Sequence, residues 1–146
     1  YDSLAMAHTG AFRNISERNR NYPLIMDAGR NVRLAFLNFT YSTNGNPVSE
    51  PFIVNAMDSV QVKEDLKKAS DRGADYIFVL PHWGVEYDLH PSPEQKYWTD
   101  MMLGCGADAI IGSHPHVPED GIIFADSSGC VENIVFYSFY LEKKKF

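Results

Sequence analysis

The sequence has few cysteines, no long apolar run and fewer basic than acidic residues. Its two cysteines, Cys105 and Cys130, are too few and too far apart for a disulfide framework or a CxxC metal knuckle, and they leave the redox compartment open. No stretch approaches the roughly 20 apolar residues of a membrane-spanning helix, and the first residues lack the pattern of a signal peptide. We therefore expect no membrane segment in this chain.

The charge balance is acidic. The chain carries 13 Lys and Arg against 19 Asp and Glu, for a net charge of −6. Because affinity for phosphate backbones comes mainly from clustered Lys and Arg, this balance argues against nucleic acid as a partner. Arg13, Arg18 and Arg20 are a local exception in a polar stretch. They indicate either a solvated connector or an arginine cluster that binds an anionic group.

The apolar content is sufficient for one folded domain. Hydrophobic residues make up 45% of the 146 residues, a length that fits a single domain over residues 1–146. The chain begins at Tyr1 and not at Met. We therefore expect that a longer reading frame precedes it.

Short apolar runs alternate with helix signals. The runs at 32–41, 75–80, 108–112 and 134–137 predict strands, and the first two are apolar on nearly both faces, as in covered parallel strands. Asp58 and Ser92 are placed to cap helices, since each has a glutamine three residues later. The tripeptide Gly-Ala-Asp occurs at 73–75 and again at 106–108, each time between a helix and a strand. This order predicts an α/β fold with consecutive strand-helix units and a largely parallel sheet.

Histidines follow two of these strands. His82 comes two residues after the apolar run that ends at Leu80, and His114 and His116 follow the run that ends at Gly112. Ligands collect at the carboxyl ends of parallel strands, so the three imidazoles converge if the strands are neighbours. In an extended segment, His114 and His116 would also point the same way. Imidazole suits zinc, iron or manganese, so a metal site is the natural interpretation.

The residues around these histidines have weaker signals. Glu86 could donate a proton, support a histidine or be an ordinary exposed acid. Trp83 and Gly84 are expected to pack and to turn the chain. His8 and His90 lie in polar stretches and are expected to be ordinary surface residues.

Two motifs resemble a known family. The segment PHWGVEYDLHPSPEQ at 81–95, followed by GADAIIGSHPHV at 106–117, resembles the bacterial capsule synthesis proteins of the CapA type, associated with poly-gamma-glutamate capsule. Several spaced motifs agree in order and spacing. The resemblance covers residues 10–117 and thins out beyond them.

That family is similar to the calcineurin-like metallophosphatases. The resemblance implies a four-layer α-β-β-α sandwich around a two-metal centre. Carried over by position, His82 and His114 would hold one metal ion and His116 the other. The glutamate of the capsule family's own HWG-x-E motif falls on Glu86, which is the candidate catalytic acid or base. Two such ions would polarise a phosphoryl oxygen and activate a bridging water. The implied cofactor is a divalent transition metal, zinc, manganese or iron, with up to two ions in the complete domain.

The chain also departs from that pattern. The early Asp, Gly-Asp and Asn-His segments of the metallophosphatases do not occur in it, and the family ending Tyr-Ser-Leu-Gly-Asn-Phe is replaced at Tyr137-Ser138-Phe139-Tyr140. We therefore expect the carboxyl-terminal portion of such a domain, hence a partial sandwich with apolar surface left open.

The resemblance leaves two functions to compare. The first is a metal-dependent hydrolase or transferase of capsule biosynthesis, acting on an anionic polymer or a phosphoester substrate. The second is a non-catalytic subunit of the capsule machinery that binds polymer or partner subunits. Either one implies a cell-envelope location that faces outward.

Overall fold

The computed structural model describes residues 6–139 of the chain. Residues 140–146, where the sequence departs furthest from the family ending, lie outside this range. The elements, in chain order, are β1 (Ala11–Phe12), α1 (Ile15–Asn21), β2 (Leu24–Asp27), β3 (Arg33–Thr40), β4 (Ile53–Val54), α2 (Ser59–Asp71), β5 (Tyr76–His82), α3 (Pro93–Gly104), β6 (Ala109–Ile111), β7 (Gly121–Ala125) and β8 (Val131–Phe136).

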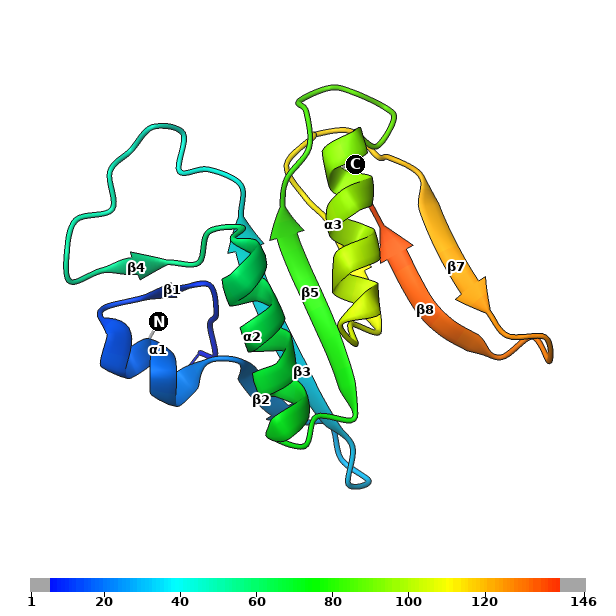
Figure 1. Ribbon diagram of the computed structural model, residues 1–146, viewed down its shortest axis with the longest axis horizontal. Helices are drawn as coiled ribbons and strands as arrows, with labels where there is room; N and C mark the ends of the chain where they lie inside the picture. Colours follow the sequence, from blue (N-terminus) through cyan, green and yellow to red (C-terminus); the bar gives the residue numbers. More distant parts are fainter. Residues whose placement is uncertain (1–5, 140–146) are drawn as a thin grey trace, which may run out of the picture.

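One six-stranded sheet organises the molecule, in the order β2-β3-β5-β6-β8-β7. The four central strands are parallel, and β2 and β7 pair antiparallel at the two edges. Figure 1 shows α2 and α3 side by side on one face of this sheet. Because α2 connects β3 to β5 and α3 connects β5 to β6, the predicted α/β order of consecutive strand-helix units is confirmed.

The starts of the two long helices follow from their caps. The Asp58 side chain accepts hydrogen bonds from the backbone N–H groups of Val60 and Gln61. Ser92 and Gln95 form a reciprocal capping box, with a proline in the first turn of α3. Both helix starts are therefore confirmed where the sequence places them. None of the described helices has the length and apolarity needed to cross a membrane.

The two faces of the sheet differ in how well they are covered. Under α2 and α3 the side chains are fully buried, among them Leu37, Val79, Ile110 and Val135 at 0% exposure. The side chains on the opposite face are only half-buried: Leu34, Phe36, Phe78, Leu80 and Ile111. Two of these, the rings of Phe36 and Phe78, stack with centroids 5.3 Å apart. A face of this composition suits packing against a second sheet, so the structure is consistent with part of a metallophosphatase-like sandwich.

Two strands of the six-stranded sheet are absent from the sequence prediction, as are the two-residue strands β1 and β4. Both β2 and β7 are short edge strands, and β7 is exposed along its whole length. An edge strand of this kind is defined by the neighbour to which it bonds, since its own residues do not alternate cleanly between a buried and an exposed face. The prediction for β5 also stops short, because His82 is itself the last residue of that strand.

The repeated Gly-Ala-Asp tripeptide has the same structural role twice. Gly73 and Gly106 adopt φ values of +74° and +94°, which turn the chain after each helix. The Asp75 carboxylate then accepts a hydrogen bond from the Arg33 backbone N–H at 2.8 Å. In the same way, the Asp108 carboxylate accepts one from the Ile77 backbone N–H at 2.7 Å. Each aspartate thus ties the start of its strand to the neighbouring parallel strand.

A buried polar pair joins α3 to the loop after β6. The Gln95 amide donates to the Glu119 carboxylate at 2.7 Å, and its oxygen accepts from the Ser92 backbone N–H at 2.8 Å. Gln95 is 1% exposed and Glu119 is 9% exposed. A Cβ atom on Gly84 would lie 2.8 Å from the Gln95 amide nitrogen, so the loop after β5 also packs on this pair. Desolvation raises the pKa of the Glu119 carboxyl above its ordinary value.

We expect Asp108→Ala to destabilise the fold more than Asp75→Ala. The first change leaves the N–H of Ile77, which is 5% exposed, without its acceptor and should cost about 1 to 3 kcal/mol. The second removes the same bond from Arg33, which is exposed, so water can replace it. Urea denaturation of both variants measures the difference. Equal losses of unfolding free energy in the two variants would contradict a greater contribution from the buried Asp108 hydrogen bond.

We expect Glu119→Gln to be more stable than the wild type at neutral pH. Because the folded-state pKa of Glu119 is raised, the charged carboxylate weakens the fold at pH values above that pKa, and the penalty disappears as the pH falls below the pKa of the unfolded chain. The stability gap between variant and wild type should therefore be largest near pH 7 and vanish at acidic pH. Thermal melts from pH 4 to pH 7 measure it. A gap independent of pH would show that Glu119 does not titrate in this way.

Candidate metal centre

The three predicted histidines lie together at the carboxyl edge of β5 and β6. These two strands are parallel neighbours, and their pairing continues into a bridge between His82 and Ser113. The ring centroids of His82 and His114 are 4.6 Å apart, and those of His114 and His116 are 6.0 Å apart. The condition that the two strands be neighbours is thus met, and the imidazoles converge as predicted.

The backbone of the His-Pro-His segment differs from the expected one. His114 and His116 adopt φ values of 109° and 61°, in the left-handed region, so the expectation of an extended segment is wrong. Tyr87, in the facing loop, also has a positive φ of 65°. Its N–H donates to the carbonyl of Pro115 at 2.8 Å and so joins the two loops. Positive φ in three non-glycine residues around one hydrogen bond is the kind of local strain that clusters at functional sites.

Glu86 completes the cluster. Its carboxylate lies 3.8 Å from Nε2 of His116, and both side chains are about half-exposed, at 54% and 55%. One potential donor atom from each of Glu86, His114 and His116 lies within 4.8 Å of the other two. The sequence suggests an acid or base role for Glu86, whereas this geometry also suits it as a metal ligand.

His82 is oriented by a neighbouring hydroxyl. The Thr40 hydroxyl donates to the carbonyl of Ser42 at 2.7 Å, and it lies 3.3 Å from Nδ1 of His82. Since that hydroxyl proton is already used, His82 donates through Nδ1, which leaves its Nε2 lone pair available to a ligand. Desolvation lowers the pKa of His82, and the charges of His114 and His116 lower it further. The neutral imidazole that binds metals is therefore the favoured form.

Two tyrosines that sequence reasoning missed flank the histidines. The Tyr41 ring lies 4.8 Å from that of His114 and 5.9 Å from that of His82. On the other side, Tyr87 stacks on His116 with centroids 5.9 Å apart. Tyr41 follows β3, the other parallel neighbour of β5, and this position was the signal available in the sequence. The tyrosines limit the directions in which the imidazole rings can turn.

A buried tryptophan stabilises the start of the loop that carries Glu86. Trp83 is 2% exposed, and its indole N–H donates to the carbonyl of Tyr137 at 2.8 Å. A Cβ atom on Gly112 would lie 2.0 Å from that carbonyl oxygen and 2.4 Å from the indole nitrogen, so only glycine fits there. Gly84 turns the chain with a φ of +89°. Trp83 and Gly84 thus pack and turn as the sequence suggests.

The donor set fits a divalent transition metal. Imidazole and carboxylate groups are the usual ligands of zinc, iron and manganese, with bonds of about 2.0 to 2.2 Å for zinc. Donors around one such ion are about 3 to 4 Å apart, slightly closer than the 4.8 Å limit found for Glu86, His114 and His116. These three residues would hold the first ion, and His82 lies beside them, with its ring centroid 4.6 Å from that of His114. His90 is exposed and does not belong to this group.

The three amino-terminal arginines do not act as one cluster. Arg18 is buried and forms an ion pair with Asp65 at 2.5 Å, while its Nε donates to the Asn55 side chain. Arg13 pairs with Glu17 in the first turn of α1. Of the three, only Arg20 is exposed and forms no side-chain hydrogen bond or ion pair within the described residues. The alternative of a single arginine cluster is therefore wrong, because burial of Arg18 removes its central member.

The chain matches a protein family over nearly its whole length. The model of the bacterial capsule synthesis protein family PGA_cap aligns with residues 1–139. The motifs that carry the resemblance, with their histidines and Glu86, fall inside this region.

Two curated relatives agree with the family match. The chain is 34% identical to the capsule biosynthesis protein CapA of Bacillus anthracis over 113 residues, which are 73% of this chain and 26% of the relative. It is 38% identical to the PGA biosynthesis protein CapA of Bacillus subtilis (strain 168) over 65 residues, which are 44% of this chain and 16% of the relative. The matched region is thus about a quarter or less of each relative's length. The chain belongs to the bacterial capsule synthesis protein family PGA_cap.

Proposed function

We propose that this chain forms part of a metal-dependent hydrolase or transferase of capsule biosynthesis. The observation that carries the proposal is the convergence of Glu86, His114 and His116, with potential donor atoms within 4.8 Å of one another. His82 lies beside them, 4.6 Å from His114 between ring centroids. The substrate class that we propose is an anionic polymer of the poly-gamma-glutamate type or a phosphoester, in an outward-facing compartment of the cell envelope.

The side chains of such a site would have different roles. When bound, a transition-metal ion supplies Lewis acidity and lowers the pKa of water. Glu86, His114 and His116 would hold the ion. The Thr40 hydroxyl lies beside Nδ1 of His82, which leaves Nε2 of His82 available to a ligand. The acid or base role that the sequence suggests for Glu86 is the alternative to its role as a ligand. Trp83 and the Tyr87 bond to Pro115 keep the two loops at a constant separation.

A second candidate is a non-catalytic subunit that binds polymer or partner subunits of the capsule machinery. One observation favours it. Within residues 6–139, a single group of His, Cys, Asp or Glu side chains has donor atoms close enough for an ion. Hydrolysis of the metallophosphatase type uses two ions about 3.5 to 4 Å apart. A single ion would be enough to bind a carboxylate or to stabilise the loops.

Metal content tests the site directly. We expect about one transition-metal ion per chain after reconstitution with zinc, manganese or iron, and loss of that ion in His114→Ala and His116→Ala. His90→Ala is the matched control, because His90 is an exposed histidine outside the cluster and this variant should keep the ion. Plasma mass spectrometry measures the stoichiometry. If the wild type takes up no ion from any of the three metals, both the site and the proposed enzyme are ruled out.

Turnover separates the two candidates. The enzyme predicts metal-dependent hydrolysis of generic phosphomonoesters or of an oligoglutamate, reduced to background in His116→Ala. The binding subunit predicts no turnover with the metal-loaded wild type, together with unchanged polymer binding in His116→Ala. Colorimetric phosphate release and chromatography of the oligomer measure turnover, and fluorescence anisotropy measures binding. His90→Ala again serves as the control.

A further inference from the structure

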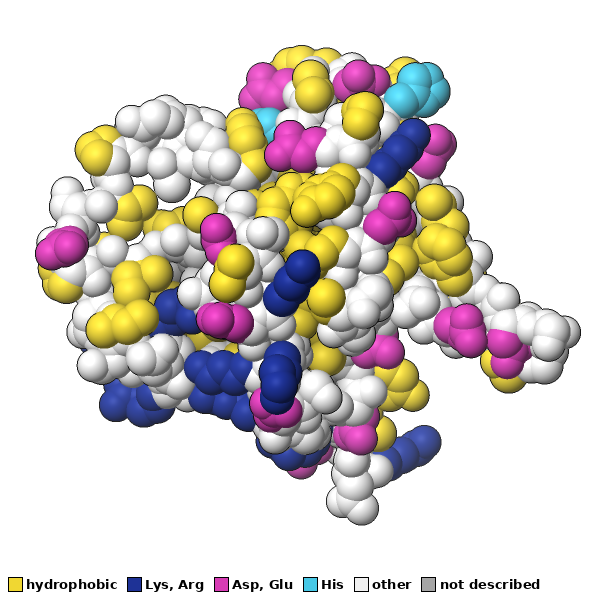
Figure 2. All heavy atoms as spheres, viewed as in Figure 1, with side chains coloured by type: hydrophobic (Ala, Val, Ile, Leu, Met, Phe, Trp, Pro, Cys, Tyr) yellow, Lys and Arg dark blue, Asp and Glu magenta, His cyan; other side chains and the backbone are white. Residues whose placement is uncertain are grey.

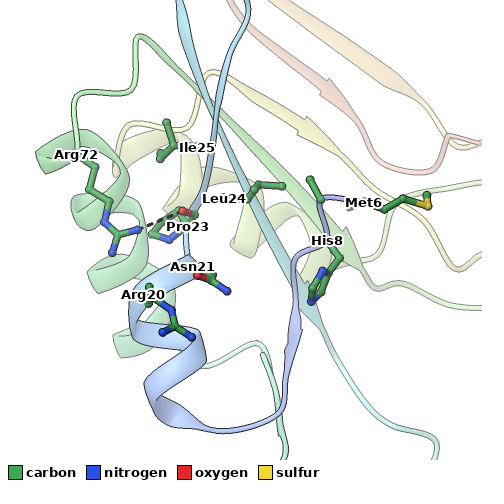
Figure 3. A pocket seen from close by; sticks show the side chains of 9 residues that line it. Met6, His8, Arg20, Asn21, Pro23, Leu24, Ile25 and Arg72 are labelled. Carbon is green, nitrogen blue, oxygen red and sulfur yellow. Dashed lines mark hydrogen bonds between the residues drawn. The ribbon is translucent and has the colours of Figure 1, made fainter. Parts of the chain in front are cut away.

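A second candidate site lies along the β2 edge of the sheet and shares no residue with the histidine cluster. It is a cavity of about 560 Å³ between the end of α1, the start of β2, the end of α2 and the amino-terminal segment. Figure 3 shows Arg72 reaching from α2 to the Pro23 carbonyl, with His8 on the amino-terminal segment across from Asn21. Strand β3 separates this edge from β5. The cavity is therefore independent of the proposed metal centre.

The polar lining of the cavity is basic. Arg20, Arg72, His8 and Asn21 line it, and no Asp or Glu is among the described residues of its wall. Arg20 is exposed. Arg72 donates to the carbonyls of Asn19 and Pro23, at 2.9 and 3.4 Å, which uses two of the five guanidinium N–H donors. Two guanidinium groups thus have donors available for a ligand.

The carboxylates closest to these arginines along α2 are already paired. Asp65 forms the buried ion pair with Arg18, at 2.5 Å, and Asp71 is bonded to Lys67 on the surface of α2. Because their charges are already matched, they do not neutralise the cations at the cavity. In Figure 2, Lys and Arg side chains gather over α1 and the adjoining part of α2, away from the histidines seen at the opposite end.

Lys68, which neighbours the cavity, lies in a local excess of positive charge. Lys68 donates to the same Asn19 carbonyl as Arg72, at 3.2 Å. Partial burial lowers its pKa, and the charges of Arg72 and Arg18 lower it further. Positive groups therefore crowd this surface although the chain as a whole has a net charge of −6. An anion bound here would relieve their mutual repulsion.

The rest of the wall is aliphatic. Met6, Pro23, Leu24 and Ile25 contribute its apolar side. A guanidinium group matches a planar carboxylate through two parallel hydrogen bonds. The apolar wall would at the same time cover short methylene chains. This combination suits a carboxylate on an aliphatic spacer better than a phosphate, which has no apolar part to bury.

We propose that this cavity binds carboxylate side chains of an acidic amino-acid polymer, with Arg20 and Arg72 as the recognising cations. The identity of the polymer rests on the proposed function in capsule biosynthesis, whereas the carboxylate chemistry rests on the cavity alone. The remaining acidic surface repels such a polymer, so the arginines select where it docks. The site provides polymer binding without a metal ion.

The test is direct binding of a fluorescent γ-linked glutamate oligomer to the 146-residue chain. Arg20→Gln should weaken binding about tenfold, the effect of losing one charge-assisted hydrogen-bonding group. Lys96→Gln is the matched control, since it removes the same charge from an exposed position on α3. It should change the affinity less than twofold, which separates a specific site from diffuse attraction. Fluorescence anisotropy at constant ionic strength measures both.

Three results would overturn the proposal. These are wild-type affinity in Arg20→Gln, an equal loss in Lys96→Gln, and stronger competition by polyphosphate than by unlabelled oligoglutamate. Arg20 carries the test because Arg72→Gln would also remove bonds that support the end of α1. A melting curve for Arg20→Gln confirms that it folds.

Failure of this site can be distinguished from failure of the proposed enzyme. Arg20→Gln should keep the metal content of the wild type, and the metal-free wild type should keep an oligoglutamate affinity that depends on Arg20. Loss of metal in Arg20→Gln, or loss of all oligomer binding in the metal-free wild type, would mean that the two sites are not independent and would contradict the assignment.

Discussion

The parallel pairing of β5 with β6 is the constraint on which the candidate site depends. The regular register joins only Phe78 to Ala109 and Val79 to Ile110, so the short β6 has few ladder bonds of its own. Asp108 adds a side-chain bond to Ile77 at the start of the pair. At the other end, the Trp83 N–H donates to the Ser113 carbonyl and the Ser113 N–H donates to the Pro81 carbonyl, each at 3.0 Å. Pairing at both ends brings the two histidine-bearing loops to one edge of the sheet.

The loops then need interactions that the sheet does not supply. His114, His116 and Tyr87 adopt left-handed backbone conformations, which are unfavourable for residues with a Cβ atom. The bond from Tyr87 to Pro115 and the buried pair of Gln95 and Glu119 hold these loops in place. These hydrogen bonds therefore maintain the arrangement of the cluster.

The two candidate sites differ in the chemistry that they can perform. The histidine cluster, at the carboxyl edge of the parallel strands, has donors that suit a transition metal. The arginine-lined cavity, at the β2 edge, has cations and an aliphatic wall but no metal ligand set. A protein that handles an acidic polymer needs a region that attracts the polymer, because the chain's net charge of −6 works against it. In the proposed arrangement, one site recognises carboxylates and the other carries the metal chemistry.

The long helices, the central strands and the candidate ligands could be predicted from the amino-acid sequence alone. Caps at Asp58 and Ser92 and short apolar runs are local signals, since they depend on residues a few positions apart. Other features became visible only in the folded molecule: the edge strands, the left-handed turns at His114 and His116, the flanking rings of Tyr41 and Tyr87, and the burial of Arg18 against Asp65. Each of these is set by a partner more than a few residues away or by a loop conformation that composition does not specify. Local preferences are therefore readable along the chain, whereas long-range contacts are settled only when the elements pack.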